Sequence, residues 1–175
     1  MIDEKDKKIS LLLEDLAALE TYISDIFTFS PLPLCFISPL GVILESNPAF
    51  VKISRFSFDE IIGKAIEELF NKKEIEELVN DTLEKGTIGG REMLFSPKGR
   101  KEILVQVFTK ARKEEKGEIV GYFISLFDLT KIKKTENELR ERVEELEKFH
   151  KLTVGRELKM VELKEKIKEL ETKNN

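Results

Sequence analysis

Glu118–Lys134 has the sequence EIVGYFISLFDLTKIKK, which is mainly apolar up to Phe127 and mainly polar and charged after it. Residues 119–127 are apolar at positions that point to both faces of an extended chain, which predicts a strand that needs cover on both sides. Asp128 and Thr130 follow, and both residue types favour the start of a helix. We therefore expect a buried strand to pass directly into a charged helix that leaves the core, with Asp128 and Thr130 coupling the two.

The composition limits the class of protein. The chain has 175 residues, which fits one domain with appendages, and its net charge is -4. The sequence has no basic patch interleaved with aromatic residues, so we expect no nucleic-acid partner. A single cysteine excludes an internal disulfide and fits a reducing compartment, and we expect a cytoplasmic protein.

One stretch, 26–44, is apolar enough to resemble a membrane span. It contains Pro31, Pro33 and Pro39, which would break a spanning helix. The N-terminus shows no apolar run of the kind a signal peptide needs. We expect no membrane segment in this chain, although a fragment of a larger receptor stays an open alternative.

The N-terminal region 1–29 predicts an amphipathic helix. Its apolar residues recur with the 3,4 spacing of a heptad seam, which favours a self-dimerising coiled coil. The alternative is a helix that docks on the sheet of its own domain. The seam consists of Ile9, Leu12, Leu16, Leu19, Ile23 and Ile26.

The middle of the chain alternates between strands and helices. Short strands are expected at 34–37 and 41–44, then short helices from Pro48 to Phe70, then a longer helix over 71–85 with Leu83 on its apolar face. Three strands follow, at 87–95, 100–111 and 119–127. A block of helices between runs of strands indicates an α+β fold with an antiparallel sheet.

The C-terminal region 131–175 predicts a long charged helix and a second coiled-coil seam. This seam changes phase between its two halves, which would overwind a coiled coil locally. Two independent helices joined at Gly155, or a restart at Thr135, are the alternatives. The seam residues are Leu139, Val143, Leu146, Leu163, Ile167 and Leu170. The spacing does not decide between a parallel and an antiparallel dimer.

Three motifs resemble those of the PAS domain family over roughly 30–130. Asn47-Pro48-Ala49-Phe50 is similar to the start of the PAS helical block, and 58–64, FDEIIGK, is similar to the segment that follows it. Asp128-Leu129-Thr130 resembles the motif that joins the last PAS strand to a signalling helix. Arg55-Phe56 departs from the Gly-Tyr of many members. The resemblance implies a five-stranded antiparallel sheet with short helices on one face, flanked by long helices, and it implies a dimer with a helical output.

The residues also bear on cofactors. The PAS region has no histidine for a haem iron and no cysteine where related flavin photosensors carry one, so neither cofactor is expected, and no metal-ligand spacing is evident. A core filled by its own side chains is favoured, with a small apolar ligand as the alternative. The residues that would line a pocket are Phe36, Ile43, Phe50, Ile53, Ile66, Phe70, Ile75, Leu78, Val79, Val105 and Ile124.

We expect a sensor or relay module of the kind found in two-component systems rather than an enzyme. It would form a homodimer and pass a small-molecule or conformational signal to an unidentified downstream protein or domain. A ligand-free structural dimerisation module and a degenerate fragment of a sensor histidine kinase are the alternatives. His150 is the only histidine, and Lys151 follows it where a phosphoacceptor would have an acidic neighbour, so we expect a solvated histidine in the helix.

Overall fold

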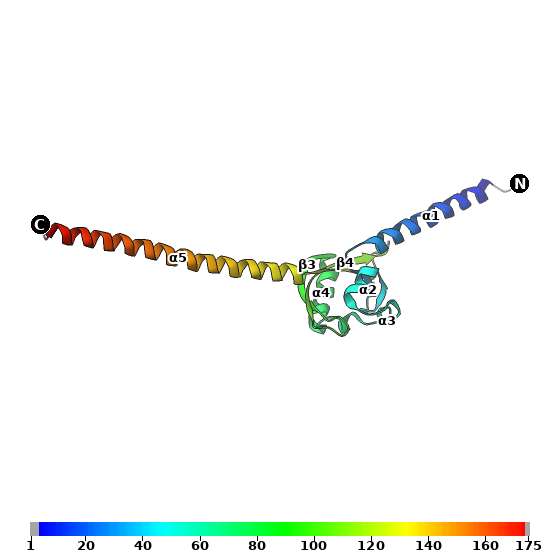
Figure 1. Cartoon of the computed structure of the whole chain (residues 1–175). Helices are drawn as coiled ribbons and strands as arrows, with labels where there is room; N and C mark the ends of the chain where they lie inside the picture. The colour runs from blue at the N-terminus through cyan, green and yellow to red at the C-terminus, as the bar shows by residue number, and fades with distance from the viewer. Residues whose placement is uncertain (1–3, 174–175) are drawn as a thin grey trace. The chain divides into compact units, whose positions relative to one another are not determined.

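The computed structural model describes residues 4–173, and it describes their side chains except those at 4, 157, 165 and 168–173. The chain divides into two units, with the boundary between Thr130 and Lys131. The first unit has the predicted α+β fold (Figure 1). Its elements are α1 (Glu4–Phe29), β1 (Leu34–Ile37), β2 (Ile43–Ser46), α2 (Pro48–Ser54), α3 (Phe58–Ile61), the 3-10 helix η1 (Ile66–Glu68), α4 (Lys72–Lys85), β3 (Thr87–Phe95), β4 (Ile103–Lys113) and β5 (Ile119–Asp128). The second unit begins at Lys131 and contains all of α5 (Thr130–Lys173) except its first residue.

The five strands form one antiparallel sheet in the order β2-β1-β5-β4-β3. β5 is therefore the central strand, paired with β1 on one side and with β4 on the other. Cys35 lies opposite Ile124 in the first pair, and Val107 lies opposite Leu126 in the second. The strand that leads into α5 is thus fixed along both of its edges.

The two faces of the sheet differ. Tyr122, Ile124 and Leu126 of β5 are buried on the face that carries the core. On the opposite face, Phe123 and Phe127 are each 40% exposed. In the single chain the face of β5 toward the helical block is covered, whereas the opposite face is covered only in part, so the prediction of cover on both sides is met on one face only.

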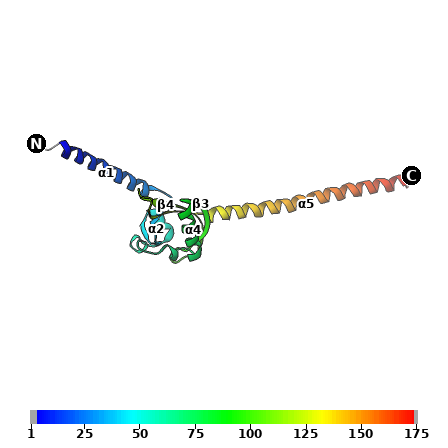
Figure 2. The ribbon, with the colours of Figure 1, turned by 180° about the vertical axis from the view of Figure 1, so that it is seen from behind.

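The helical block begins and ends where the sequence dictates. Asn47 caps α2, and Pro48 occupies the first helical turn, where its missing N–H group costs nothing. Arg55 ends α2 with φ at 60°, a left-handed conformation that favours glycine. The turn after α2 therefore forms although arginine stands at the position where many PAS domains carry glycine. Figure 2 shows the same elements from behind.

Helix α4 packs on the sheet through a face that differs from the expected one in one position. Ile75 and Leu78 are buried as expected, but Leu83 is 47% exposed. Thr82 is buried in its place, and its hydroxyl group shares a hydrogen bond with that of Thr109 on β4. A polar pair inside the core therefore links α4 to the sheet.

The C-terminal helix α5 is continuous over its 44 residues. Gly155 lies inside the helix, so the alternative of two helices joined at this glycine is wrong. Thr135 donates a side-chain hydrogen bond to the carbonyl group of Lys131 in the preceding turn, and the helix does not restart there.

Candidate functional site

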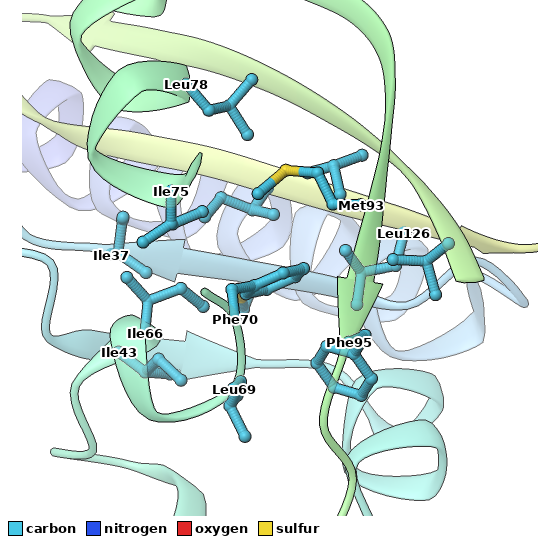
Figure 3. Packing of buried hydrophobic residues seen from close by; sticks show 14 of the residues in the cluster. Ile37, Ile43, Ile66, Leu69, Phe70, Ile75, Leu78, Met93, Phe95 and Leu126 are labelled. Atoms are coloured by element: carbon cyan, nitrogen blue, oxygen red, sulfur yellow. The ribbon is translucent and has the colours of Figure 1, made fainter. Parts of the chain in front are cut away.

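The core beneath the helical block contains most of the predicted pocket residues. One hydrophobic cluster includes ten of the eleven, eight of them buried and Ile53 and Val79 partly buried (Figure 3). The exception is Phe36. Its neighbour across the strand pair is Phe123, on the other face of the sheet, and the two rings lie 4.9 Å apart. Phe36 therefore does not line the interior, and including it among the pocket residues was wrong.

Aromatic rings occupy the centre of this core. Figure 3 shows Phe70 and Phe95 among the buried side chains. Their rings meet edge to face at 5.2 Å, and the rings of Phe50 and Phe95 meet at 6.2 Å. Phe95 and Met93 are both buried on β3 and were absent from the predicted lining. All three residues of 93–95, Met-Leu-Phe, are apolar, so the sequence alone does not distinguish the buried Met93 and Phe95 from the half-exposed Leu94 between them.

The core offers little reactive chemistry. Cys35 is buried in it, and burial raises the pKa of the thiol group far above its usual range, so the thiol stays protonated at neutral pH. Within residues 4–173, the described side chains form no cluster of three His, Cys, Asp or Glu that could hold a metal ion. His150 lies on α5, in the other unit, and is exposed.

The entry to the domain from α1 is organised by Asn47, whose side chain is fully buried. Its carboxamide oxygen accepts hydrogen bonds from the N–H groups of Leu34 and Phe50, each at 2.9 Å. Its amide nitrogen donates to the carbonyl groups of Phe27, at 3.2 Å, and Leu32, at 2.8 Å. One side chain therefore connects the end of α1, the linker, β1 and α2.

The exit from the domain is Asp128-Leu129-Thr130. The carboxylate of Asp128 accepts a hydrogen bond from the N–H group of Thr130 at 2.8 Å, which caps the start of α5. Leu129 is buried, and its N–H group donates to the carbonyl group of Leu104 on β4 at 3.0 Å. Asp128 and Thr130 were predicted, whereas Leu129, which anchors the exit to the sheet, was not.

The linker that enters the domain after α1 lies beside the end of β5, where the chain leaves the domain. The N–H group of Leu126, near the end of β5, donates to the carbonyl group of Pro33 in the linker after α1 at 3.0 Å. The backbone that follows α1 and the backbone that precedes α5 are therefore joined by a direct hydrogen bond.

The predicted seam residues are exposed on both helices. Along α1, the six seam side chains from Ile9 to Ile26 are each more than half exposed. Along α5, Leu139, Val143, Leu146, Leu163 and Ile167 are exposed, while the side chain of Leu170 lies outside the described residues. The seam side chains that the structure describes on both helices are thus exposed in the single chain.

The comparisons with known proteins follow this geometry. A model of the PAS domain matches residues 31–131, which is more than half of the chain. The chain belongs to the PAS domain family. Members of this family serve sensing and signal transduction, and no protein with a curated function matches this sequence.

Solved PAS structures share the fold at low sequence identity. The PAS domain of a protein from Colwellia psychrerythraea has a TM-score of 0.59 at 15% identity, and the match covers 65% of this chain and 98% of that one. The PAS domain of an HTR-like protein from Haloarcula marismortui has a TM-score of 0.55 at 19% identity, with 68% and 98% covered. A PAS domain from a two-component sensor histidine kinase has a TM-score of 0.55 at 9% identity, with 64% and 98% covered. None of the helices over residues 4–173 is long and apolar enough to span a bilayer.

Proposed function

We propose that this protein is a cytoplasmic PAS relay module, without enzymatic activity, that forms a homodimer through its flanking helices. A signal that reaches the PAS core or α1 alters β5, and Asp128, Leu129 and Thr130 transmit the change to the pitch or register of α5. The receiver is a downstream signalling protein or domain, of the two-component type in the simplest case.

The observation that carries this proposal is the hydrogen bond between Pro33 and Leu126, because it joins the two segments that lead to α1 and α5. Supporting it, the exit is held at two points. The carboxylate of Asp128 caps the helix, and the backbone of Leu129 is bonded to β4. The exposed seams of both helices provide the surfaces through which two chains would pair.

The test is disulfide crosslinking along α5 in the full chain. Single cysteines replace Leu139, Val143 or Leu146 in turn, and the native Cys35 does not interfere because it is buried. Asp128→Ala removes the cap but leaves the Leu129 anchor. We expect it to change which α5 positions crosslink efficiently.

The matched control is Glu115→Ala, which removes an exposed carboxylate from the β4–β5 hairpin. It should leave the crosslinking pattern unchanged. If Asp128→Ala folds and gives the pattern of the unaltered protein, Asp128 does not couple the domain to the helix.

A second function, a structural dimerisation module with a filled core, is favoured by the contact of Phe70 and Phe95 at the core centre. This function requires neither a ligand nor a transmitted change. A small molecule retained in the core through purification would contradict it, as would an Asp128→Ala crosslinking pattern that differs from that of the unaltered protein.

A further inference from the structure

A cleft of about 540 Å³ opens where the linker after α1, helix α2 and the end of β5 meet. Every residue that lines it precedes Thr130, so the cleft belongs to the first unit. Its apolar wall includes Leu32, Ile53, Ile103 and Phe127. Leu32 and Phe127 are 44% and 40% exposed, which leaves apolar surface open to a ligand.

Three cations lie on the rim of the same cleft. They are Lys52 and Arg55 at the end of α2 and Arg100 in the loop between β3 and β4. Within the described part of the chain, none of the three has a carboxylate partner within ion-pair distance. The one carboxylate in the lining, that of Asp128, already accepts the N–H group of Thr130. Positive charge therefore exceeds negative charge around an apolar wall.

We propose that this cleft binds a small organic anion with an apolar tail, of the medium-chain monocarboxylate class. The guanidinium groups of Arg55 and Arg100 suit a carboxylate, which arginine binds through two parallel hydrogen bonds. The tail covers Leu32, Ile53 and Phe127 and removes their exposed surface from water. An inorganic anion would leave these apolar side chains exposed to water. A neutral molecule of the same length would leave the lysine and arginine side chains of the cleft without a negatively charged partner.

The cleft lies beside the two segments that lead to α1 and α5, so a bound ligand could influence both. The cleft is lined by both Pro33 and Leu126, the two residues whose backbone hydrogen bond joins entry to exit. An anion there would contact the linker after α1 and the strand end before α5 at once. The site lies outside the aromatic core, so its existence does not depend on whether the relay itself operates.

The test is a titration of the full chain with sodium octanoate, followed by NMR of the methyl groups of Ile53, Ile103 and Leu126. Inorganic phosphate and 1-octanol are the comparison ligands.

The variant is Arg55→Asn with Arg100→Gln, because asparagine tolerates the left-handed φ of residue 55. Lys113→Gln is the matched control, since it removes an exposed cation from the far end of β4.

We expect octanoate to saturate the shifts of these methyl groups below about 1 mM. The double variant should weaken binding by at least about tenfold, through loss of charge-assisted hydrogen bonds, and Lys113→Gln should leave it unchanged. Equal binding of 1-octanol, or equal shifts from phosphate, would overturn the proposal. So would shifts confined to core methyl groups such as those of Ile75, or the absence of saturation by about 10 mM octanoate.

Discussion

Asn47 is the residue on which the entry to the PAS domain depends most. Its buried carboxamide group satisfies backbone groups of four different segments, so its loss would leave the N–H groups of Leu34 and Phe50 without their side-chain acceptor. A buried polar group without a partner costs more than an exposed one, because water cannot replace the lost bond.

Asn47→Ala should therefore lower the free energy of unfolding by about 3 kcal/mol, as measured by urea denaturation. Asn71→Ala is the matched control, because Asn71 also caps a helix, α4, but is exposed. We expect a loss of about 1 kcal/mol for the control. Equal losses for the two variants would show that Asn47 is only a helix cap.

Glu60 has a pKa that its partners hold low. The hydrogen bond from Lys98, and then the one from the N–H group of Ser57, lower the pKa of the Glu60 carboxyl group from its ordinary 4.5 to about 2. The folded-state pKa lies below the ordinary value, so this carboxylate stabilises the fold above pH 4.5 and the stabilisation is lost as the pH falls toward 2.

Lys98→Met should raise the pKa of Glu60 toward 4.5, because the largest of the lowering interactions is gone. An NMR titration of the Glu60 side-chain carboxyl carbon measures this shift. Lys101→Met, a neighbouring exposed lysine, is the control and should leave the Glu60 pKa near 2. A Glu60 that titrates near 4.5 in the unaltered protein would contradict the assigned contact.

At the scale of elements, the sequence predicted the order of the strands and helices but not every boundary or face, since β2 was expected at 41–44 and lies at Ile43–Ser46. The alternation along β4 indicates which residues point inward, and Val105 and Val107 are indeed buried. β1 has only four residues and all are apolar, so alternation could not show that Phe36 belongs to the other face. Thr82 was missed because its burial depends on Thr109, a partner far away in the sequence.

The close pairing of β5 with β1 gives a test at this scale. A Cβ atom at Gly121 would meet the carbonyl oxygen of Ile37 and the ring of Phe36. Gly121→Ala should therefore lower the free energy of unfolding by roughly 3 kcal/mol. Urea denaturation measures it.

Gly89→Ala is the matched control for the change at Gly121. Residue 89 lies on β3 with no atom within 4 Å of an added Cβ and without a left-handed φ. The control should stay within about 1 kcal/mol of the unaltered protein. A Gly121→Ala variant as stable as this control would mean that β1 and β5 are less closely packed than described.

For the whole molecule, the motifs of the helical block and of the exit were enough to predict the family and the α+β fold. The sequence could not show that Pro33 and Leu126 are hydrogen-bonded, because this contact depends on the tertiary fold rather than on any local pattern. Gly155 was an ambiguous signal, since glycine weakens a helix by about 1 kcal/mol without necessarily ending it.

The heptad seam of α1 predicts a dimer, and two adjacent leucines test it. Leu12 lies on the seam and Leu11 lies off it, yet both side chains are 59% exposed. Leu12→Lys should weaken the dimer by at least about tenfold in sedimentation equilibrium, because a charge would be buried in the seam, whereas Leu11→Lys should not. Equal effects would show that the seam has no special role.

Native mass spectrometry of the unaltered full chain, compared with its denatured mass, tests the dimeric PAS module most directly. The account predicts a particle of twice the chain mass. Additional mass on that dimer would identify a bound ligand and give its size, and a bare dimer would place the input in the helices. A monomer at concentrations well above those in a cell would contradict the account, since the exposed seams of α1 and α5 would then have no partner chain.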